Sequence, residues 1–198
     1  MPTALTIIRQ SSYTATPWRN GGGTTHEAIR VPAGADSFRW RVSVANIEVS
    51  GPFSDFAGYR RTMVLLRGTG LTLKFANGEQ RVLQKIGDLV NFDGAVSTFC
   101  ELHDGPCVDL NFMVSSAARA EVRILGVHDS APVQASDENS TLILSIADPM
   151  LLQSEAGETV RLEPWDLAVL SRGSVRLGTV QPAASSVPSA VFFATISP

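Results

Sequence analysis

Alternation of apolar and polar residues dominates this sequence and predicts β-strands. The segments 38–44 (FRWRVSV), 71–75 (LTLKF) and 109–114 (DLNFMV) place apolar side chains at every second position, as half-buried strands do. The short apolar run 63–66 (MVLL) is typical of a strand that is covered on both faces. Helical periodicity is weak throughout, and the best candidate helix is the short segment 115–121.

Turn signals separate these apolar segments at short intervals. Asn77 and Gly78 lie between two of them and form the clearest β-hairpin signal. Many short strands joined by regular turns are typical of an all-β sandwich or barrel.

Part of the first half of the chain recurs in the second half. The segments that begin at Met63, Gly78 and Asp88 reappear in the same order at Leu142, Gly157 and Asp166. The repeat predicts two related β-barrel halves, residues 1–125 and 126–198. The polar stretch 126–140 is the expected linker between them.

Charge and composition narrow the classes of partner. The net charge is -3 and the pI is about 5.6, whereas a nucleic-acid-binding protein normally carries a basic excess. The hydrophobic fraction of 44% and the charged fraction of 18% are those of a folded chain. We see no signal-peptide pattern and no apolar run long enough to span a membrane. We therefore expect a cytoplasmic protein with no nucleic-acid and no membrane partner.

The metal-ligating residue types are too scattered to predict a metal site. His26, His103 and His128 form no HxH or HExxH motif, and Cys100 and Cys107 form no CxxC motif. We expect no metal and no cofactor.

A glycine-rich segment, residues 17–27 (PWRNGGGTTHE), is the first candidate site. Three consecutive glycines permit a close approach of the backbone to a neighbour. A phosphate-binding loop would need a Lys-Ser/Thr pair and a following helix, and neither is indicated here. The segment is either a binding loop or a tight bend at the mouth of a barrel.

The second candidate lies on two predicted strands. Arg41 and Ser43 share one strand face, and Asp109 and Asn111 share a face of another. A guanidinium enclosed in a barrel needs an anion or a carboxylate partner, so an Arg41–Asp109 pair is one possibility. The alternative is that all four side chains point to solvent.

The third candidate is the loop 50–61 (SGPFSDFAGYRR), which leads into the strand at Met63. It contributes Ser54 and Arg61 to the end of that strand. Loops beside a rigid barrel commonly carry binding groups.

Taken together, the segments 17–27, 38–61, 65–70 and 109–114 resemble the HutD/Ves family. The resemblance implies a cupin-like fold with two cupin halves, a bicupin. It also implies a small cytoplasmic bacterial protein, associated with histidine utilisation, that moderates the pathway by binding one of its metabolites. The resemblance supplies no established catalytic activity.

Cupin enzymes usually hold a metal on two or three histidines and a glutamate. Here the expected HxH position reads FSDFAG (53–58), and the segment 92–98 (FDGAVST) lacks the further histidine. The resemblance therefore implies a barrel without the metal centre. The family motifs assign ligand binding to Trp18, Arg19, Asn20, Gly22, Glu27, Trp40, Arg41, Ser43, Ser54, Arg61, Asp109 and Asn111.

Three functional hypotheses remain open. The leading one is a metal-free binding protein for a small anionic metabolite of the urocanate or formylglutamate type, held by Arg41. The second is a metal-independent isomerase or epimerase with Glu27 or Asp109 as general base. The third is a structural or interaction protein. A homodimer is compatible with each of them.

Overall fold

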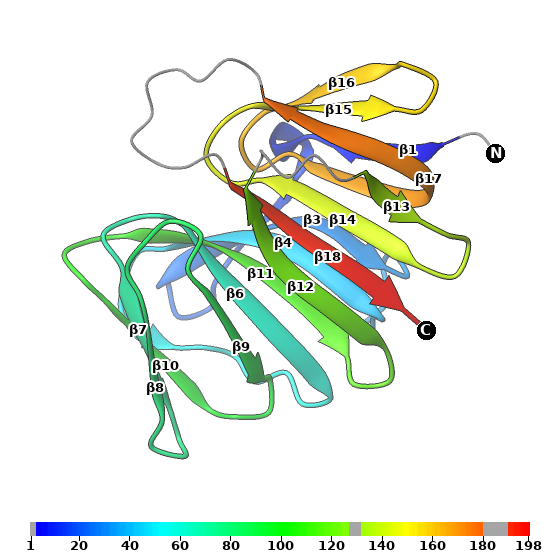
Figure 1. The fold of residues 1–198 in the computed structure, drawn as a ribbon. Coiled ribbons are helices and arrows are strands. Elements are labelled where there is room, and N and C mark those ends of the chain that lie inside the picture. The colour runs from blue at the N-terminus through cyan, green and yellow to red at the C-terminus, as the bar shows by residue number, and fades with distance from the viewer. Residues whose placement is uncertain (1–2, 127–131, 180–189) are drawn as a thin grey trace. The chain divides into compact units, whose positions relative to one another are not determined.

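The computed structural model describes residues 3–126, 132–179 and 190–198, and their elements are almost all antiparallel β-strands (Figure 1). The helical residues among them belong to one short 3-10 turn, Gln10–Ser12. This confirms the predicted all-β class. The chain divides into two compact units: unit 1 comprises Met1–Ser12 and Ala118–Pro198, and unit 2 comprises Tyr13–Ala117.

Unit 2 is built from two antiparallel sheets. In spatial order, the larger sheet contains β2 (Thr14–Pro17), β3 (Gly23–Val31), β4 (Trp40–Ile47), β11 (Cys107–Ser115), β6 (Tyr59–Arg67) and β9 (Leu89–Asp93). The smaller sheet contains β5 (Gly51–Pro52), β10 (Thr98–Leu102), β7 (Leu71–Phe75) and β8 (Gln80–Leu83). Both contribute to one apolar core, in which Met63 and Leu65 of the larger sheet meet Leu71 and Leu73 of the smaller.

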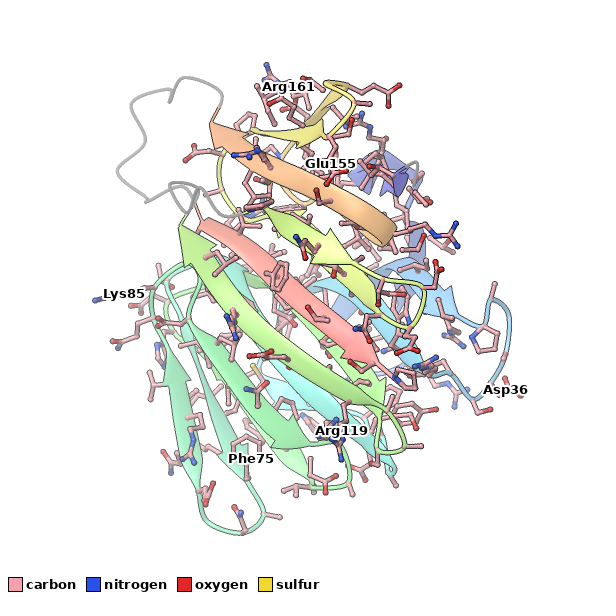
Figure 2. All side chains as sticks on the ribbon, turned by 45° about the vertical axis from the view of Figure 1, so that its right-hand side comes forward. Asp36, Phe75, Lys85, Arg119, Glu155 and Arg161 are labelled. Atoms are coloured by element: carbon pink, nitrogen blue, oxygen red, sulfur yellow. The ribbon has the colours of Figure 1, made fainter. Side chains whose placement is uncertain are left out.

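The alternating segments of unit 2 became strands as predicted. Residues 71–75 are β7, and residues 109–114 lie within β11. The Asn77–Gly78 hairpin is confirmed, since it joins β7 to β8 and Gly78 has a φ of +87°. Phe75 is buried against Phe92, whereas Lys85 is exposed (Figure 2).

Unit 1 has a sheet of similar construction. Its strands, in spatial order, are β12 (Arg119–Gly126), β18 (Ala190–Ser197), β14 (Ser140–Ser145), β17 (Leu167–Thr179), β15 (Met150–Ser154) and β16 (Thr159–Leu162). Two further strands, β1 (Ala4–Ile8) and β13 (Val133–Ala135), pair with β17. Buried aliphatic side chains such as Ile143, Leu170 and Val191 fill its core.

The strand order of unit 1 matches that of unit 2. The path β12-β18-β14-β17 corresponds to β4-β11-β6-β9, and the hairpin β15–β16 corresponds to β7–β8. The turns match as well. Gly157 is the counterpart of Gly78 in the repeat and has a φ of +84°. Trp165 is the counterpart of Gly87, and both residues have a positive φ. This correspondence is consistent with the sequence repeat. The boundaries of the compact units differ from those of the halves predicted from the sequence, residues 1–125 and 126–198. Strands β1 and β12 belong to unit 1, because β1 pairs with β17 and β12 pairs with β18.

The predicted helix at 115–121 is wrong. Ser115 ends β11, residues 116–118 form a turn, and residues 119–121 are the first residues of β12. Cross-strand pairing outweighs the weak local helical preference there. Of the expected linker 126–140, residues 127–131 lie outside the described residues, and Val133–Ala135 forms β13. Among the described residues, no helix has the length and apolar character needed to cross a membrane.

Candidate functional site

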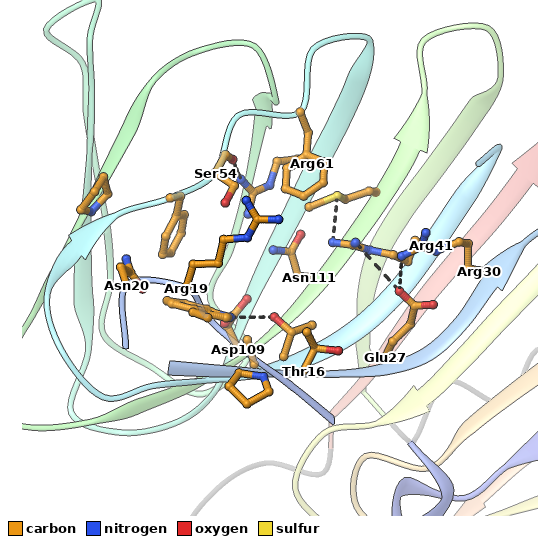
Figure 3. Close-up of a pocket in the computed structure, with 18 residues that line it drawn as sticks. Thr16, Arg19, Asn20, Glu27, Arg30, Arg41, Ser54, Arg61, Asp109 and Asn111 are labelled. Atoms are coloured by element: carbon orange, nitrogen blue, oxygen red, sulfur yellow. Dashed lines mark hydrogen bonds and ion pairs between the residues drawn. The ribbon is translucent and has the colours of Figure 1, made fainter. Parts of the chain in front are cut away.

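A cavity of about 570 Å³ lies within unit 2 (Figure 3). Its wall is the inner face of β3, β4, β11 and β6, and its rim is formed by residues 16–20 and 52–56. The lining is strongly basic for its size, with four arginines (Arg19, Arg30, Arg41, Arg61) against two carboxylates (Glu27, Asp109).

Strand register explains which side chains face the cavity. Met113 of β11 lies between Arg41 of β4 and Arg61 of β6, and Asp109 lies between Ala45 and Leu65 in the same way. Because side chains alternate between the two faces of a strand, these rows share the inner face. Asn111 occupies the row between them.

A β-bulge in β3 gives the cavity one more arginine. The register between β3 and β4 shifts between Glu27 and Ile29, so that Glu27 pairs with Ser43 and Arg30 pairs with Arg41. The inserted residue turns both Glu27 and Arg30 to the cavity side, and an Arg30 nitrogen donates to Glu27 Oε2 at 2.8 Å. Glu27 Oε2 is also 3.9 Å from Arg41 Nη1.

Aromatic rings hold the two inner guanidinium groups. Arg41 lies 5.3 Å from the ring centre of Phe38 and 5.1 Å from that of Phe56. Arg61 lies 5.4 Å from the same Phe56 ring and 4.9 Å from that of Phe92. Stacking of this kind stabilises a cation without using its N–H donors, so the guanidinium groups are positioned while donors stay available.

Several buried polar atoms of the cavity have no hydrogen-bond partner. Among the described residues these include the Nε atoms of Arg30, Arg41 and Arg61, Asp109 Oδ2 and Asn111 Oδ1. A buried polar atom without a partner costs about 1–3 kcal/mol. A group of them around one cavity is therefore typical of a site that a ligand completes.

Burial dominates the ionisation of the inner groups. Asp109 is 2% exposed, and this burial raises the pKa of its carboxyl to about 7, although Arg61 opposes the shift. Burial likewise lowers the pKa of Arg61 to about 10 and also lowers that of Arg41. Both arginines are cations at neutral pH, whereas Asp109 titrates there.

The rim is organised by Trp18 and Asn20. Trp18 Nε1 donates to Thr25 Oγ1 at 2.8 Å, and its ring packs edge-on against Phe53. Asn20 Oδ1 accepts a hydrogen bond from the Gly22 backbone N–H at 3.0 Å. Arg19 is exposed, and its guanidinium extends over the cavity (Figure 3).

Gly23 sets how closely this rim lies against β4. A Cβ atom there would lie 2.2 Å from the Asn46 carbonyl oxygen and 3.2 Å from the Trp18 ring. We expect Gly23→Ala to lower the free energy of unfolding by about 2 kcal/mol, because backbone and ring must both move. Thermal unfolding measures this, with Gly51→Ala as control, since a Cβ atom there meets nothing closer than 4.0 Å. Equal stability of the two variants would contradict the prediction.

All but three of the predicted site residues line the cavity. Those that do are Trp18, Arg19, Asn20, Glu27, Arg41, Ser54, Arg61, Asp109 and Asn111. Gly22 lies just behind the rim, where its carbonyl accepts hydrogen bonds from the Glu48 and Val49 N–H groups. Ser43 lies on the same face of β4 as Arg41 but is only 1% exposed and does not line the cavity. Trp40 is buried on the opposite face of β4.

The pairing of charges differs from the one considered from the sequence. Arg41 lies four positions from Asp109 in the register, and its carboxylate neighbour is Glu27. Arg61 is the cation that acts on Asp109. Arg30, Phe53, Phe56 and Met113 also line the cavity without having been predicted.

The cavity does not fit a metal cation. In the parts of the chain that the structure describes, no three His, Cys, Asp or Glu side chains gather in a group that could hold one. The lining has no histidine, and its arginines would repel a cation. His103 bonds to Thr72 instead, at 2.8 Å between Nε2 and Oγ1, and His128 lies outside the described residues.

The cysteines of unit 2 do not resemble nucleophiles. Cys100 and Cys107 are both buried free thiols. Burial raises the pKa of the Cys100 thiol to about 12 and also raises that of Cys107. A thiol in this state carries almost no thiolate at neutral pH.

Sequence comparison finds a matching family and curated relatives. The family model described as HutD matches residues 10–186. An uncharacterized 21.2 kDa protein in the hutC 3′ region of Pseudomonas putida is 35% identical over 176 residues, which cover 88% of this chain and 90% of the relative. Protein Ves of Escherichia fergusonii is 32% identical over 54% of this chain and 56% of its own length.

Solved structures with the same fold include two from Pseudomonas. A conserved protein of unknown function from Pseudomonas aeruginosa PAO1 superposes with a TM-score of 0.84 at 27% identity, over 98% of this chain and 100% of that chain. HutD from Pseudomonas fluorescens SBW25 (formate condition) has a TM-score of 0.79 at 28% identity, over 97% and 98%. Oxalate decarboxylase from Lactobacillus farciminis, at 9% identity, a TM-score of 0.59 and coverages of 96% and 85%, shares the cupin-like fold alone.

Proposed function

Because this chain belongs to the HutD family, which links it to histidine utilisation, we propose that it binds a small carboxylate metabolite without a metal. Binding of that metabolite moderates the pathway. The site is the cavity of unit 2, and the ligand carboxylate lies against Arg41 and Arg61.

The observation that carries this proposal is the set of buried guanidinium donors without a partner. Arg41 and Arg61 each have a buried Nε atom that forms no hydrogen bond. Nearby carboxylates do not neutralise them fully, because Glu27 is bonded to Arg30 and Asp109 is only partly ionised at neutral pH. A carboxylate ligand supplies both the charge and the paired acceptors that a guanidinium prefers.

The size of the cavity fits a small organic acid. A volume of about 570 Å³ lies within the range of small-molecule sites. One or two charge-assisted hydrogen bonds, with further contacts to the Trp18 ring, correspond to a micromolar affinity of about -8 kcal/mol.

Isothermal titration calorimetry of the full chain tests this proposal. We expect at least one of urocanate, N-formylglutamate and formate to bind, the last because it appears in the description of the Pseudomonas fluorescens structure. Urocanate methyl ester, which lacks the negative charge, is the matched control and is expected to bind at least tenfold more weakly. The proposal fails if none of the three acids binds, or if urocanate binds and its methyl ester binds as tightly.

A metal-independent isomerase or epimerase is the second candidate, and Asp109 favours it. A carboxyl group with a pKa of about 7 in a cavity suits a general base. NMR spectra of the bound acid, recorded over hours, separate the two functions. A ligand that remains unchanged supports a binding protein, whereas conversion that is lost in Asp109→Asn supports the enzyme.

A further inference from the structure

A second, smaller cavity lies within unit 1. Its volume is about 110 Å³, and its lining is polar apart from Pro132: Gln134, Gln153, Ser154, Glu155, Ser174 and Arg176. The register brings three strands together here, because β17 pairs with β13 at Ser174 and with β15 at Arg176. Ser174 and Arg176 share one face of β17, and the core residue Val175 between them points to the other.

The sequence repeat explains why unit 1 has space at this position. Ser154 ends β15 where Phe75 ends β7. The two hairpin turns form the same hydrogen bond, since the N–H of each residue donates to the carbonyl of a glutamate four positions later, at 2.8 Å and 2.9 Å. In unit 2 the Phe75 ring is buried against Phe92. In unit 1 the smaller serine leaves space, and its buried Oγ atom has no hydrogen-bond partner, which is typical of a site that a ligand completes.

Two opposite charges line this cavity without neutralising each other. Glu155 extends from the hairpin over β17 (Figure 2), where its Oε1 atom accepts a 2.6 Å hydrogen bond from the Ser174 hydroxyl. Ser174 is 6% exposed, so this charge-assisted bond fixes the carboxylate to a buried point of the sheet. None of the ion pairs among the described residues includes Glu155 or Arg176. Both residues are exposed, so a ligand can reach both charges from solvent.

We propose that the unit 1 cavity binds the head group of an α-amino acid, with its ammonium group against Glu155 and its carboxylate against Arg176. A ligand with a single charge would leave one of these side chains unpaired and place its own charge beside a like charge. The glutamine amides and the Ser154 hydroxyl supply further donors and acceptors. At about 30 Å³ per water the cavity has room for about four waters, and an amino-acid head group is of similar size. The site is separate from the unit 2 cavity and does not depend on the function proposed there.

Three small probes separate the two charges of the ligand. Glycine carries both, glycolate has a hydroxyl group in place of the ammonium, and glycinamide has a neutral amide in place of the carboxylate. We expect glycine to bind at pH 7 about tenfold more tightly than either of the others, because each of them loses one charge-assisted contact. NMR titration of the isotope-labelled full chain measures the three affinities. It also locates the site, since the backbone amide signals of Gln153 and Ser174 should shift.

Variants of the β15–β16 hairpin test the same assignment. Glu155→Gln removes the anionic group and should weaken glycine binding about tenfold. Glu158→Gln is the matched control, because Glu158 is exposed in the same hairpin and lies outside the lining, so this variant should bind glycine as the wild type does. Ser154→Phe introduces the residue found at this position in unit 2 and should abolish binding. If that variant does not fold, the exposed Glu155 still provides the test.

Several results would overturn the assignment. These are a lack of glycine binding, glycolate or glycinamide binding as tightly as glycine, and signal shifts that map to unit 2 instead of unit 1. Wild-type affinity for glycine in Glu155→Gln would do the same. Tighter binding of glycine than of both other probes, lost in Glu155→Gln and kept in Glu158→Gln, supports the site.

Discussion

Arg41→Ala is expected to weaken binding of the carboxylate ligand about 100-fold. The substitution removes one or two charge-assisted hydrogen bonds, each of about 1.5–3 kcal/mol, from a buried part of the cavity. The fold should persist, because Glu27 keeps its 2.8 Å hydrogen bond from Arg30. Arg61→Ala is the less suitable variant, since it leaves the buried Asp109 without its cation.

Two further variants test whether geometry or charge accounts for this loss. Arg41→Lys keeps the charge but cannot form the paired contact, so an intermediate loss of about tenfold is expected. Arg39 is an exposed arginine directly before β4, two positions from Arg41. The Arg39→Ala variant should therefore bind the ligand as tightly as the wild type does. Unchanged affinity in Arg41→Ala would remove Arg41 from the site.

Asp109→Asn is expected to stabilise the protein at pH 8. The pKa of Asp109 is about 7 in the folded state and about 3.9 in an unfolded chain. The folded state therefore holds this proton more strongly. The contribution of this proton to the free energy of unfolding is fully present below about pH 4 and is lost as the pH rises to about 7. This difference in pKa corresponds to a loss on the order of 4 kcal/mol, and asparagine avoids the loss because it does not ionise.

Thermal and denaturant unfolding between pH 5 and pH 8 measure this effect. The wild type should lose stability as the pH rises, and Asp109→Asn should lose much less. Glu101→Gln is the control, because Glu101 lies in an exposed ion pair with Lys74 and such pairs contribute little. A wild type with constant stability over this range, or an Asp109→Asn variant less stable at pH 8, would contradict the assignment.

The regular parts of the fold and site could be predicted from the sequence. The alternation in 38–44 and 109–114 placed Arg41, Asp109 and Asn111 on single strand faces, and the structure brings those faces to one cavity. Arg19, Asn20 and Ser54 came from the family motifs instead, since they lie in the rim segments, where no periodicity specifies direction.

The remainder depended on irregular features that a periodic pattern does not encode. Glu27 and Arg30 should face opposite sides of a regular strand, so only the bulge reveals that Arg30 joins the cavity. Phe56 looks like an ordinary loop residue in the sequence, but its ring contacts two guanidinium groups. Trp40 was assigned to the site from the family motif. The alternation along the strand places it on the face of β4 opposite to Arg41, and the structure agrees with the alternation.

The pairing of β1 with β17 has a consequence for synthesis on the ribosome. β1 leaves the ribosome before any of unit 2, whereas β17 leaves only after all of it. Unit 2 is continuous in the chain, so its cavity can form first. Until β17 appears, the backbone of β1 lacks its partner and offers an unpaired edge to other nascent chains.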